Sequence, residues 1–256
     1  MKNIIIVGCG RSGTSLVAGC FSKAGYNMGD DLLPADSSNL KGYFEDRLVN
    51  TINDEIIRKS YPKKREFLGE WIFDDENFLY RNRWLASVSL NVHLYTSKII
   101  EQQIRELCKS PFCYKDPRFS YTLPIWRRYL KDVVFICVFR HPFSTSRSII
   151  KESREFVGLH NLRMDYGVAL DIWKSIYRHI IKHSDEGNWL FLHTDQIFDG
   201  SGLDKMETFT DTRVDRSFPD KKLITKRNYG KLPKDVEDIY FKLCRLANYD
   251  AEKING

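Results

Sequence analysis

Short apolar runs alternate with stretches of helical periodicity along most of the chain. Four runs rich in β-branched or aromatic residues predict buried strands, at residues 4–9, 112–115, 133–139 and 189–192. Apolar residues spaced as on one face of a helix predict helices, at residues 13–24, 48–57, 84–107, 144–155, 166–183 and 233–247. This alternation predicts an α/β fold in which helices cover both faces of a central parallel sheet.

The remaining segments are polar or irregular. Residues 30–43 contain Pro34 and Gly42 and predict a surface loop, and residues 211–230 predict a second one. Residues 60–82 mix prolines, basic residues and aromatics, and we interpret them as an irregular insertion. The chain has 256 residues and shows no internal repeat, low-complexity tract or linker, so the sequence predicts a single domain over residues 1–256.

Composition narrows the functional classes. Hydrophobic residues make up 42% and charged residues 29%, and the net charge of +6 gives a weak preference for anionic ligands. No run of five basic residues favours nucleic acid or a membrane surface. No stretch reaches the roughly 18 apolar residues of a membrane span, and the N-terminal apolar run is too short for a signal peptide. We therefore expect a cytoplasmic protein without a membrane span.

The cysteines and histidines give no sign of a disulfide framework or a metal site. The six cysteines lie apart from one another, beside or within apolar segments, and none forms a CxxC pair. The six histidines and the carboxylates show no metal-ligand spacing. The sequence therefore predicts reduced core thiols and no metal.

A glycine-rich turn links the first predicted strand to the first predicted helix. It reads Gly8-Cys9-Gly10-Arg11-Ser12-Gly13-Thr14-Ser15, which is the frame of a phosphate-binding loop. Backbone amides in such a turn bind phosphate oxygens together with the positive end of the helix dipole, and glycines permit close approach of the anion. Residues 10–15 are therefore candidate nucleotide-binding residues.

The loop lacks the lysine of nucleotide-hydrolysing P-loops. Thr14 stands at the lysine's position, and the positive charge lies at Arg11 instead. A triphosphate with Mg²⁺ would lose part of its expected ligand set, whereas Arg11 and the neighbouring hydroxyls suit a smaller terminal anion. At this point the loop leaves two other interpretations open. The chain could be a P-loop kinase that acts on a small molecule, or a non-catalytic nucleotide-binding module.

The run Gly-x-x-Arg-Ser-Gly-Thr-Ser after an N-terminal strand resembles the 5′-phosphosulfate loop of sulfotransferases that use 3′-phosphoadenosine 5′-phosphosulfate. This resemblance implies a three-layer fold like that of the P-loop NTPases and a nucleotide sulfuryl donor. In that family a basic residue of the loop contacts the bridging and sulfuryl oxygens, and Arg11 matches its position.

A second segment resembles the family's 3′-phosphate motif, in which a strand is followed by an Arg and, eight residues later, by a Ser. Here Arg140 follows residues 133–139, and Ser148 comes at the expected spacing. An Arg at the end of a central strand lies where α/β proteins bind ligands, and its guanidinium suits phosphate. The family often has a late basic segment over the 3′-phosphate. Arg216 and Arg227 lie in that region, although surface charge is the simpler interpretation of both.

Residues 41–46 supply a candidate general base for the acceptor side. Their sequence, KGYFED, resembles a stretch of bacterial sulfotransferases and lies near the place where tyrosylprotein sulfotransferases carry a catalytic glutamate. The resemblance makes Glu45 the first candidate for the base. The alternative is an acidic residue that only stabilises the N-terminus of the next helix.

Residues 115–118 supply the other candidates. Their sequence, KDPR, resembles a stretch of the same bacterial group, and Lys115 matches a lysine that assists catalysis in cytosolic sulfotransferases. Pro117 stands where those enzymes have a histidine, which moves the role of base toward Glu45, Asp116 or a group not identified. Asp116 has a structural alternative, pairing with Arg118 or Arg140.

The ordered motifs imply a sulfotransferase that moves a sulfuryl group from 3′-phosphoadenosine 5′-phosphosulfate to a hydroxyl or amine without a metal. A small molecule, a carbohydrate or a lipid all remain open as the acceptor. We expect its pocket to be shaped by residues 30–43, 60–82 and 156–165. Candidate lining aromatics are Tyr43, Phe44, Phe67 and Trp71.

Overall fold

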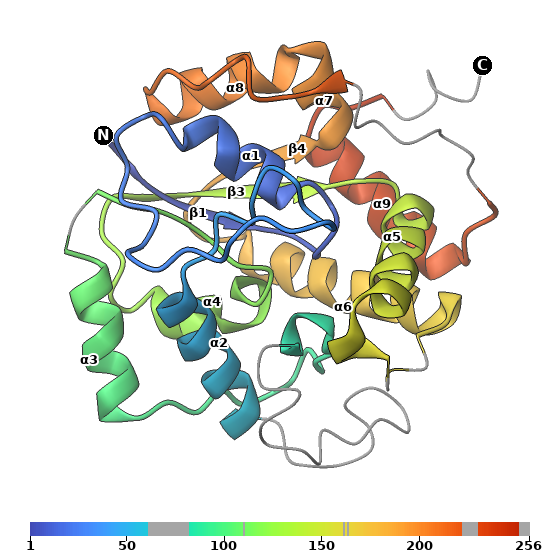
Figure 1. Ribbon diagram of the computed structural model, residues 1–256, viewed down its shortest axis with the longest axis horizontal. Helices are drawn as coiled ribbons and strands as arrows, with labels where there is room; N and C mark the ends of the chain where they lie inside the picture. Colours follow the sequence, from blue (N-terminus) through green and yellow to red (C-terminus); the bar gives the residue numbers. More distant parts are fainter. Residues whose placement is uncertain (61–81, 110, 161, 163, 222–229, 251–256) are drawn as a thin grey trace.

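A four-stranded parallel sheet lies at the centre of the molecule (Figure 1). The computed structural model describes residues 1–60, 82–109, 111–160, 162, 164–221 and 230–250. Within them the strands are β1 (Asn3–Val7), β2 (Cys113–Lys115), β3 (Val133–Phe139) and β4 (Asn188–His193), in the order β2-β1-β3-β4. Ile5 of β1 pairs with Tyr114 on one side and with Phe135 on the other. The predicted parallel sheet is confirmed.

One face of the sheet packs against three helices. Alternate strand residues, such as Ile4 and Ile6, point to this side because successive side chains of a strand face opposite ways. They pack against α1 (Thr14–Phe21), α7 (Thr194–Asp199) and α8 (Ser201–Thr210). Figure 1 shows these helices above the sheet.

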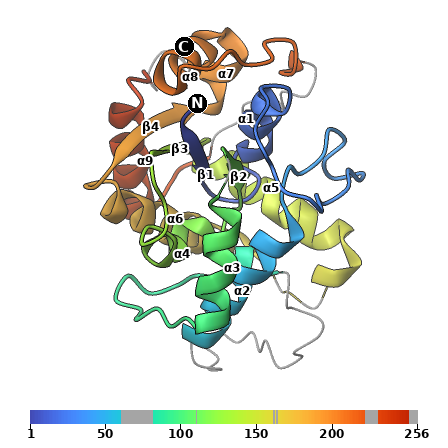
Figure 2. The ribbon, with the colours of Figure 1, turned by 90° about the vertical axis from the view of Figure 1, so that its left-hand side faces the viewer.

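The opposite face carries the larger core, into which Ile5, Val7 and Phe135 project. It is covered by α2 (Arg47–Ser60), α4 (Phe119–Trp126), α5 (Pro142–Glu155), α6 (Tyr166–His183) and α9 (Lys234–Leu246). The short helix α3 (Lys98–Leu107) adds Ile100 and Ile104 to this core and lies on the same side as α2 (Figure 2). The molecule is therefore a three-layer α/β structure, as predicted.

The strand order creates a natural crevice between β1 and β3. The chain leaves β1 toward its neighbour β2 and leaves β3 toward its neighbour β4, so the two connections diverge to opposite sides. In open α/β sheets such a divergence at the carboxyl ends of the strands is where ligands bind. The turn after β1 and the start of α5 both lie there.

The predicted helix over residues 84–107 is wrong in its first half. The structure has a 3-10 turn, η2 (Arg83–Leu85), followed by non-helical chain, and α3 begins only at Lys98. Ser97 caps α3, since its Oγ accepts a hydrogen bond from the Ile100 amide at 3.4 Å. The apolar residues that predicted a longer helix are buried in the core, but the chain that carries them is not helical.

Side chains of α4 and α6 explain why residues 86–90 need no helical hydrogen bonds. Tyr121 donates to the Ala86 carbonyl at 2.6 Å. Ser175 donates to the Val88 carbonyl at 2.8 Å, and Lys182 donates to the Leu90 carbonyl at 2.9 Å. Alternate carbonyls of the segment thus receive donors from helices that lie far away in the sequence, which satisfies these three acceptors without helical hydrogen bonds.

Three helices were not predicted, namely α4, α7 and α8. The short α4 has seven of its eight residues buried, so it lacks a polar face and a periodic signal. Gly200, with φ of 94°, separates α7 from α8.

All six cysteines are unpaired thiols. Of the predicted insertion, residues 61–81 lie outside the described residues. Among the helices that are described, none has the length and apolar character to cross a membrane.

Candidate active site

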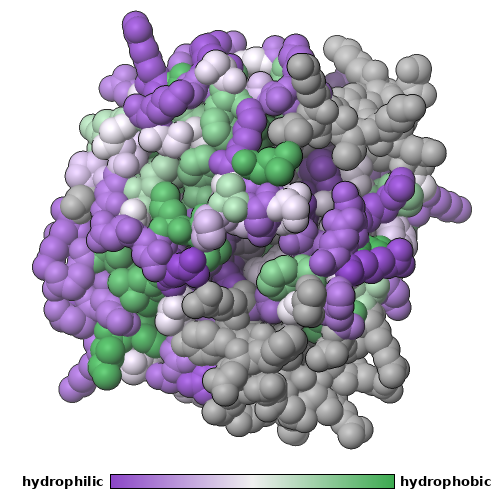
Figure 3. Space-filling model, in the orientation of Figure 1, coloured by the Kyte–Doolittle hydropathy of each residue, from purple (hydrophilic) through white to green (hydrophobic). Residues whose placement is uncertain are grey.

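A pocket of about 560 Å³ opens at the carboxyl ends of β1 and β3. The surrounding face is mostly hydrophilic, with separate hydrophobic patches (Figure 3). Most of the residues singled out from the sequence line this one pocket: Gly10, Arg11, Gly13, Thr14, Ser15, Glu45, Lys115, Arg140 and Ser148. The fold therefore brings together four motifs that are far apart in the chain.

The glycine-rich turn is fixed by close packing and by one buried tyrosine. Gly13 has φ of 91°, and a Cβ there would lie 2.3 Å from the Thr194 methyl group, so only glycine fits. The Tyr177 hydroxyl accepts a hydrogen bond from the Cys9 amide at 3.2 Å and donates to the Val138 carbonyl at 2.8 Å. The turn is thereby held against the end of β3.

Ser12 has a different position from its neighbours. Its side chain is buried beneath the turn, away from the pocket lining, and its Oγ lies 3.1 Å from Thr145 Oγ1 of α5. The hydroxyl of Ser12 therefore joins the turn to α5. Thr14 and Ser15 begin α1 at the pocket, where the first amides of a helix favour an anion.

Arg11 reaches from the turn across to α5. Its Nε donates to Ser148 Oγ at 3.2 Å, and its Nη1 lies 3.5 Å from Glu152 Oε2. Its Nη2 donates to the carbonyl of Ser38, in the predicted loop 30–43, at 3.0 Å. The side chain thus contacts the predicted 3′-phosphate motif directly.

Arg140 follows β3 immediately and lines the pocket, where its Nη2 donates to the Ser144 carbonyl at 2.6 Å. His141, the next residue, caps α5: its Nδ1 accepts a hydrogen bond from the Phe143 amide at 3.2 Å. Burial, and secondarily the charge of Arg140, lower the pKa of His141 to about 4. His141 is therefore a neutral helix cap.

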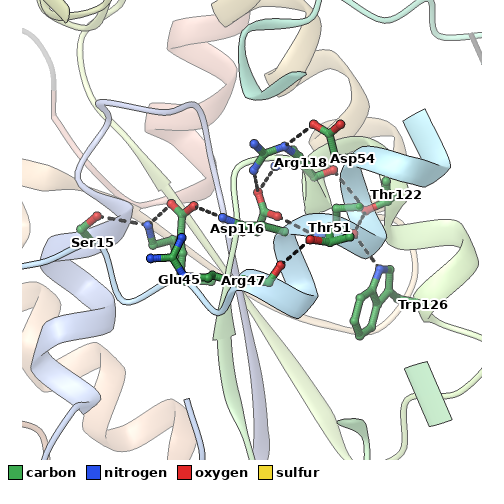
Figure 4. Close-up of polar contacts among 12 residues, drawn as sticks. Ser15, Glu45, Arg47, Thr51, Asp54, Asp116, Arg118, Thr122 and Trp126 are labelled. Atoms are coloured by element: carbon green, nitrogen blue, oxygen red, sulfur yellow. Dashed lines mark hydrogen bonds and ion pairs between the residues drawn. The ribbon is translucent and has the colours of Figure 1, made fainter. Parts of the chain in front are cut away.

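A buried ion pair joins the two predicted catalytic segments (Figure 4). Lys115 Nζ contacts Glu45 Oε1 and also donates to Ser15 Oγ at 3.1 Å. Asn50 Nδ2 donates to the other oxygen, Glu45 Oε2, at 3.0 Å. Both carboxylate oxygens of Glu45 thus have a donor, and the chain of contacts runs from the phosphate loop to α2.

Asp116 lies behind this pair, inside the protein. It is fully buried, does not line the pocket, and binds Arg118 Nη1 at 3.0 Å and Asn53 Nδ2 at 2.9 Å. Arg118 continues to Asp54 at 3.3 Å, as Figure 4 shows. Burial raises the pKa of Asp116, and Arg118 opposes that rise. This arrangement favours the scaffold alternative for Asp116 over the role of base.

The late basic residues do not join the pocket in the described part of the chain. Arg216 is exposed and pairs with Asp204 at 2.5 Å and with Glu207 at 2.6 Å. It is absent from the pocket lining. Arg227 lies outside the described residues. For Arg216 the surface-charge interpretation fits the geometry.

Comparison with known proteins identifies the family. The model of the Sulfotransferase family matches residues 3–199 of this chain, a span that contains every pocket-lining residue except Asp220. The chain belongs to the sulfotransferase family.

Two solved structures of sulfotransferase domains are similar to this chain, and the one with a TM-score of 0.51 supports the same fold. One is a sulfotransferase domain from the curacin biosynthetic pathway, which is 15% identical, has a TM-score of 0.51, and is matched over 97% of this chain and 98% of that one. Another is a sulfotransferase domain from the Synechococcus PCC 7002 olefin synthase, at 17% identity and a TM-score of 0.49, with coverage of 98% and 97%. The comparison with curated proteins found no match.

The sulfotransferase pocket also holds residues that the sequence did not single out. Ser38, Asn50, Trp84 and Glu152 all line it. Sequence spacing offered one signal, since Glu152 follows Ser148 by four residues and so shares its helix face. Asn50 and Trp84 gave no comparable signal, because only the tertiary fold brings them to the pocket.

The predicted aromatic lining is partly correct. Tyr43 lines the pocket and donates to the Asp36 carboxylate at 2.8 Å. Phe44 instead packs against Phe218, with ring centroids 5.6 Å apart, and does not line the pocket. Phe67 and Trp71 lie outside the described residues.

Proposed function

We propose that this sulfotransferase transfers a sulfuryl group from 3′-phosphoadenosine 5′-phosphosulfate to a hydroxyl or amine of an acceptor. The contact between Arg11 and Ser148 carries the proposal. It joins the motif that resembles a 5′-phosphosulfate loop to the one that resembles a 3′-phosphate site. A donor with phosphate groups at both ends of its ribose suits such a combined pocket.

The donor would lie across the ends of β1 and β3. The amides at the start of α1 and the hydroxyls of Thr14 and Ser15 suit the 5′ side of the nucleotide. Arg140 and Ser148 suit the 3′-phosphate, because a guanidinium forms charge-assisted hydrogen bonds with phosphate oxygens. Arg11 lies between them and can serve either group.

Glu45 and Lys115 would carry the transfer itself. The acceptor oxygen or nitrogen forms a bond to sulfur, the bond between sulfur and the bridging oxygen breaks, and adenosine 3′,5′-bisphosphate leaves. Glu45 receives the acceptor's proton as general base. Lys115, which contacts both Ser15 and Glu45, stabilises the charge that develops on the sulfuryl and bridging oxygens. We propose in-line transfer without a metal, because a sulfuryl group carries less charge than a terminal phosphoryl group.

Nucleotide binding tests the proposal without knowledge of the acceptor. Excess adenosine 3′,5′-bisphosphate should raise the melting temperature of the protein, because a ligand that binds only the native state stabilises it by mass action. Stabilisation by ATP with Mg²⁺, and none by the bisphosphate, would favour the kinase alternative. If the bisphosphate binds, transfer of radiolabelled sulfate to panels of carbohydrates, lipids and small alcohols or amines identifies the acceptor.

A further inference from the structure

A carboxylate lies inside this pocket, beside the groups that suit an anionic ligand. Glu152 lines the pocket, and its side chain is only 11% exposed. Its Oε2 lies 3.5 Å from Nη1 of Arg11. A negative charge at this place repels a phosphate that approaches the same arginine.

Arg11 contacts Glu152 and Ser148 at the same time. They are one helical turn apart on α5, and Arg11 contacts Ser148 through Nε and Glu152 through Nη1. The remaining guanidinium edge donates to the Ser38 carbonyl. All three nitrogens of the guanidinium are therefore engaged by the protein itself.

The backbone limits how Arg11 can escape this arrangement. Arg11 has φ of 68°, a left-handed conformation that a side-chain-bearing residue rarely adopts. The turn around it is held by Tyr177 and by the Ser12–Thr145 contact. The turn itself is therefore held in place, and a ligand phosphate that approaches the guanidinium in its present position must compete with Glu152 for it.

We propose that Glu152 is a binding determinant of the donor site, an internal anion that competes with the nucleotide's 3′-phosphate for Arg11. The competition weakens nucleotide binding and speeds release of the bisphosphate product. This inference rests on the proposed function, since it assumes that the pocket receives a 3′-phosphorylated nucleotide. A carboxylate that instead oriented Arg11 for its ligand would strengthen binding.

The sign of one substitution separates the two roles. Adenosine 3′,5′-bisphosphate is titrated calorimetrically into the wild-type chain and into Glu152→Gln, which keeps the side-chain size and removes the charge. We expect Glu152→Gln to lower the Kd about 3- to 10-fold, as the loss of one nearby repulsive charge implies. A Kd that is unchanged or higher would overturn the inference.

The same helix supplies a matched control. Glu155 lies on α5 beyond the pocket lining, is 60% exposed, and is 3.7 Å from Lys151. Glu155→Gln removes the same net charge, and we expect its Kd to stay within about twofold of the wild-type value because exposed charges are screened. An equal gain in both variants would mean that net charge, and not competition at Arg11, sets the affinity.

A second nucleotide and a second variant complete the test. Adenosine 5′-phosphate lacks the 3′-phosphate, so the gain from Glu152→Gln should disappear with it; an equal gain would contradict competition at the 3′ side. Glu152→Ala should also bind the bisphosphate more tightly, and circular dichroism and thermal melting establish that each variant folds. A wild-type chain that binds neither nucleotide would refute the proposed function, and the inference with it.

Discussion

Arg11 Nε lies 3.2 Å from Ser148 Oγ, so two residues separated by 137 positions in the sequence share one hydrogen bond in the pocket. The contact joins the turn after β1 to the helix after β3. It also shows that the loop's basic residue faces α5, and not only the start of α1. The effect of Arg11 on ligand binding should therefore depend on Ser148.

Substitution of this pair should affect nucleotide binding in a non-additive way. We expect Arg11→Ala to weaken binding of adenosine 3′,5′-bisphosphate roughly 10- to 100-fold, as loss of a charged hydrogen-bond donor implies. Ser148→Ala should weaken it less. Because the two side chains touch, a double-mutant cycle should give a coupling energy of about 0.5–3 kcal/mol. Additive effects in calorimetric titrations would mean that the two groups serve separate parts of the ligand.

Glu45→Gln should abolish most turnover and leave nucleotide binding intact. Loss of a general base typically lowers the rate about 10²- to 10⁴-fold, whereas the residues proposed to bind the bisphosphate include Ser15, which lies on the other side of Lys115 from Glu45. Turnover is measured with radiolabelled donor once an acceptor is found. Glu55→Gln is the control, since Glu55 lies on α2 and pairs with Arg58 at 2.8 Å. Full activity in Glu45→Gln would remove Glu45 from the mechanism.

Asn50→Ala should lower turnover about tenfold. Among the described residues, the Glu45 carboxylate has two donors, Lys115 at Oε1 and Asn50 at Oε2, and the substitution removes the second. Asn50 Oδ1 is buried without a partner among the described residues, so the amide is oriented to serve Glu45 at the expense of its own carbonyl. Thr51→Ala, at the exposed neighbouring position, should leave turnover unchanged. Equal losses in the two variants would indicate a general effect on α2.

Asp116→Ala should reduce stability more than chemistry. Removal of one partner leaves Arg118 short of a buried counter-ion, a change that typically costs about 3–5 kcal/mol. The loss is measured by urea unfolding, and turnover is expressed per folded molecule. We expect that turnover to stay within about threefold of wild type. A stable variant with greatly reduced turnover would instead restore Asp116 as a candidate base.

Acid should destabilise the fold through His179. Burial lowers the pKa of His179 to about 4, below the usual value of 6.5, and its Nε2 lies 3.0 Å from the Val88 carbonyl. Because the unfolded chain takes up this proton first, stability is fully present above pH 6.5 and declines as the pH falls toward 4. Between pH 7.5 and 5 this residue alone should remove about 2 kcal/mol. His179→Gln keeps a donor and should reduce the pH dependence of urea unfolding by that amount; an unchanged pH dependence would contradict it.

The sequence predicted the sheet well because buried parallel strands have a simple signature. The continuous apolar runs at β1 and β3 and the periodic face of α6 could be recognised without tertiary information. Residues 84–97 could not, because their conformation depends on donors such as Tyr121 and Ser175 from other helices. Local spacing contains no record of those donors.

The candidate site was predictable to the same extent. The motifs named Arg11, Glu45, Lys115, Arg140 and Ser148, and the fold collects all of them in one pocket. The sequence could not decide whether the Asp116 carboxylate faces the pocket or Arg118. Asp116 and Arg118 both follow the end of β2, and their spacing does not fix the direction of the carboxylate. It also gave no reason to expect that Asn50 would meet Glu45, or that a carboxylate would meet Arg11.

The two sides of the pocket come from parts of the chain that differ in how they are attached to the sheet. The turn after β1 and the start of α5 are anchored to the sheet, so their geometry is inherited with the fold. Residues 33–50 and 82–84 reach the pocket from outside the sheet, and the first of these segments is attached through the Ser38 carbonyl and the Glu45 carboxylate. Such segments can change in length and sequence while these two attachments persist. Exchange of residues 39–44, which lie between the two attachments, should therefore be a practical route to new acceptor preferences that leaves the proposed nucleotide site in place.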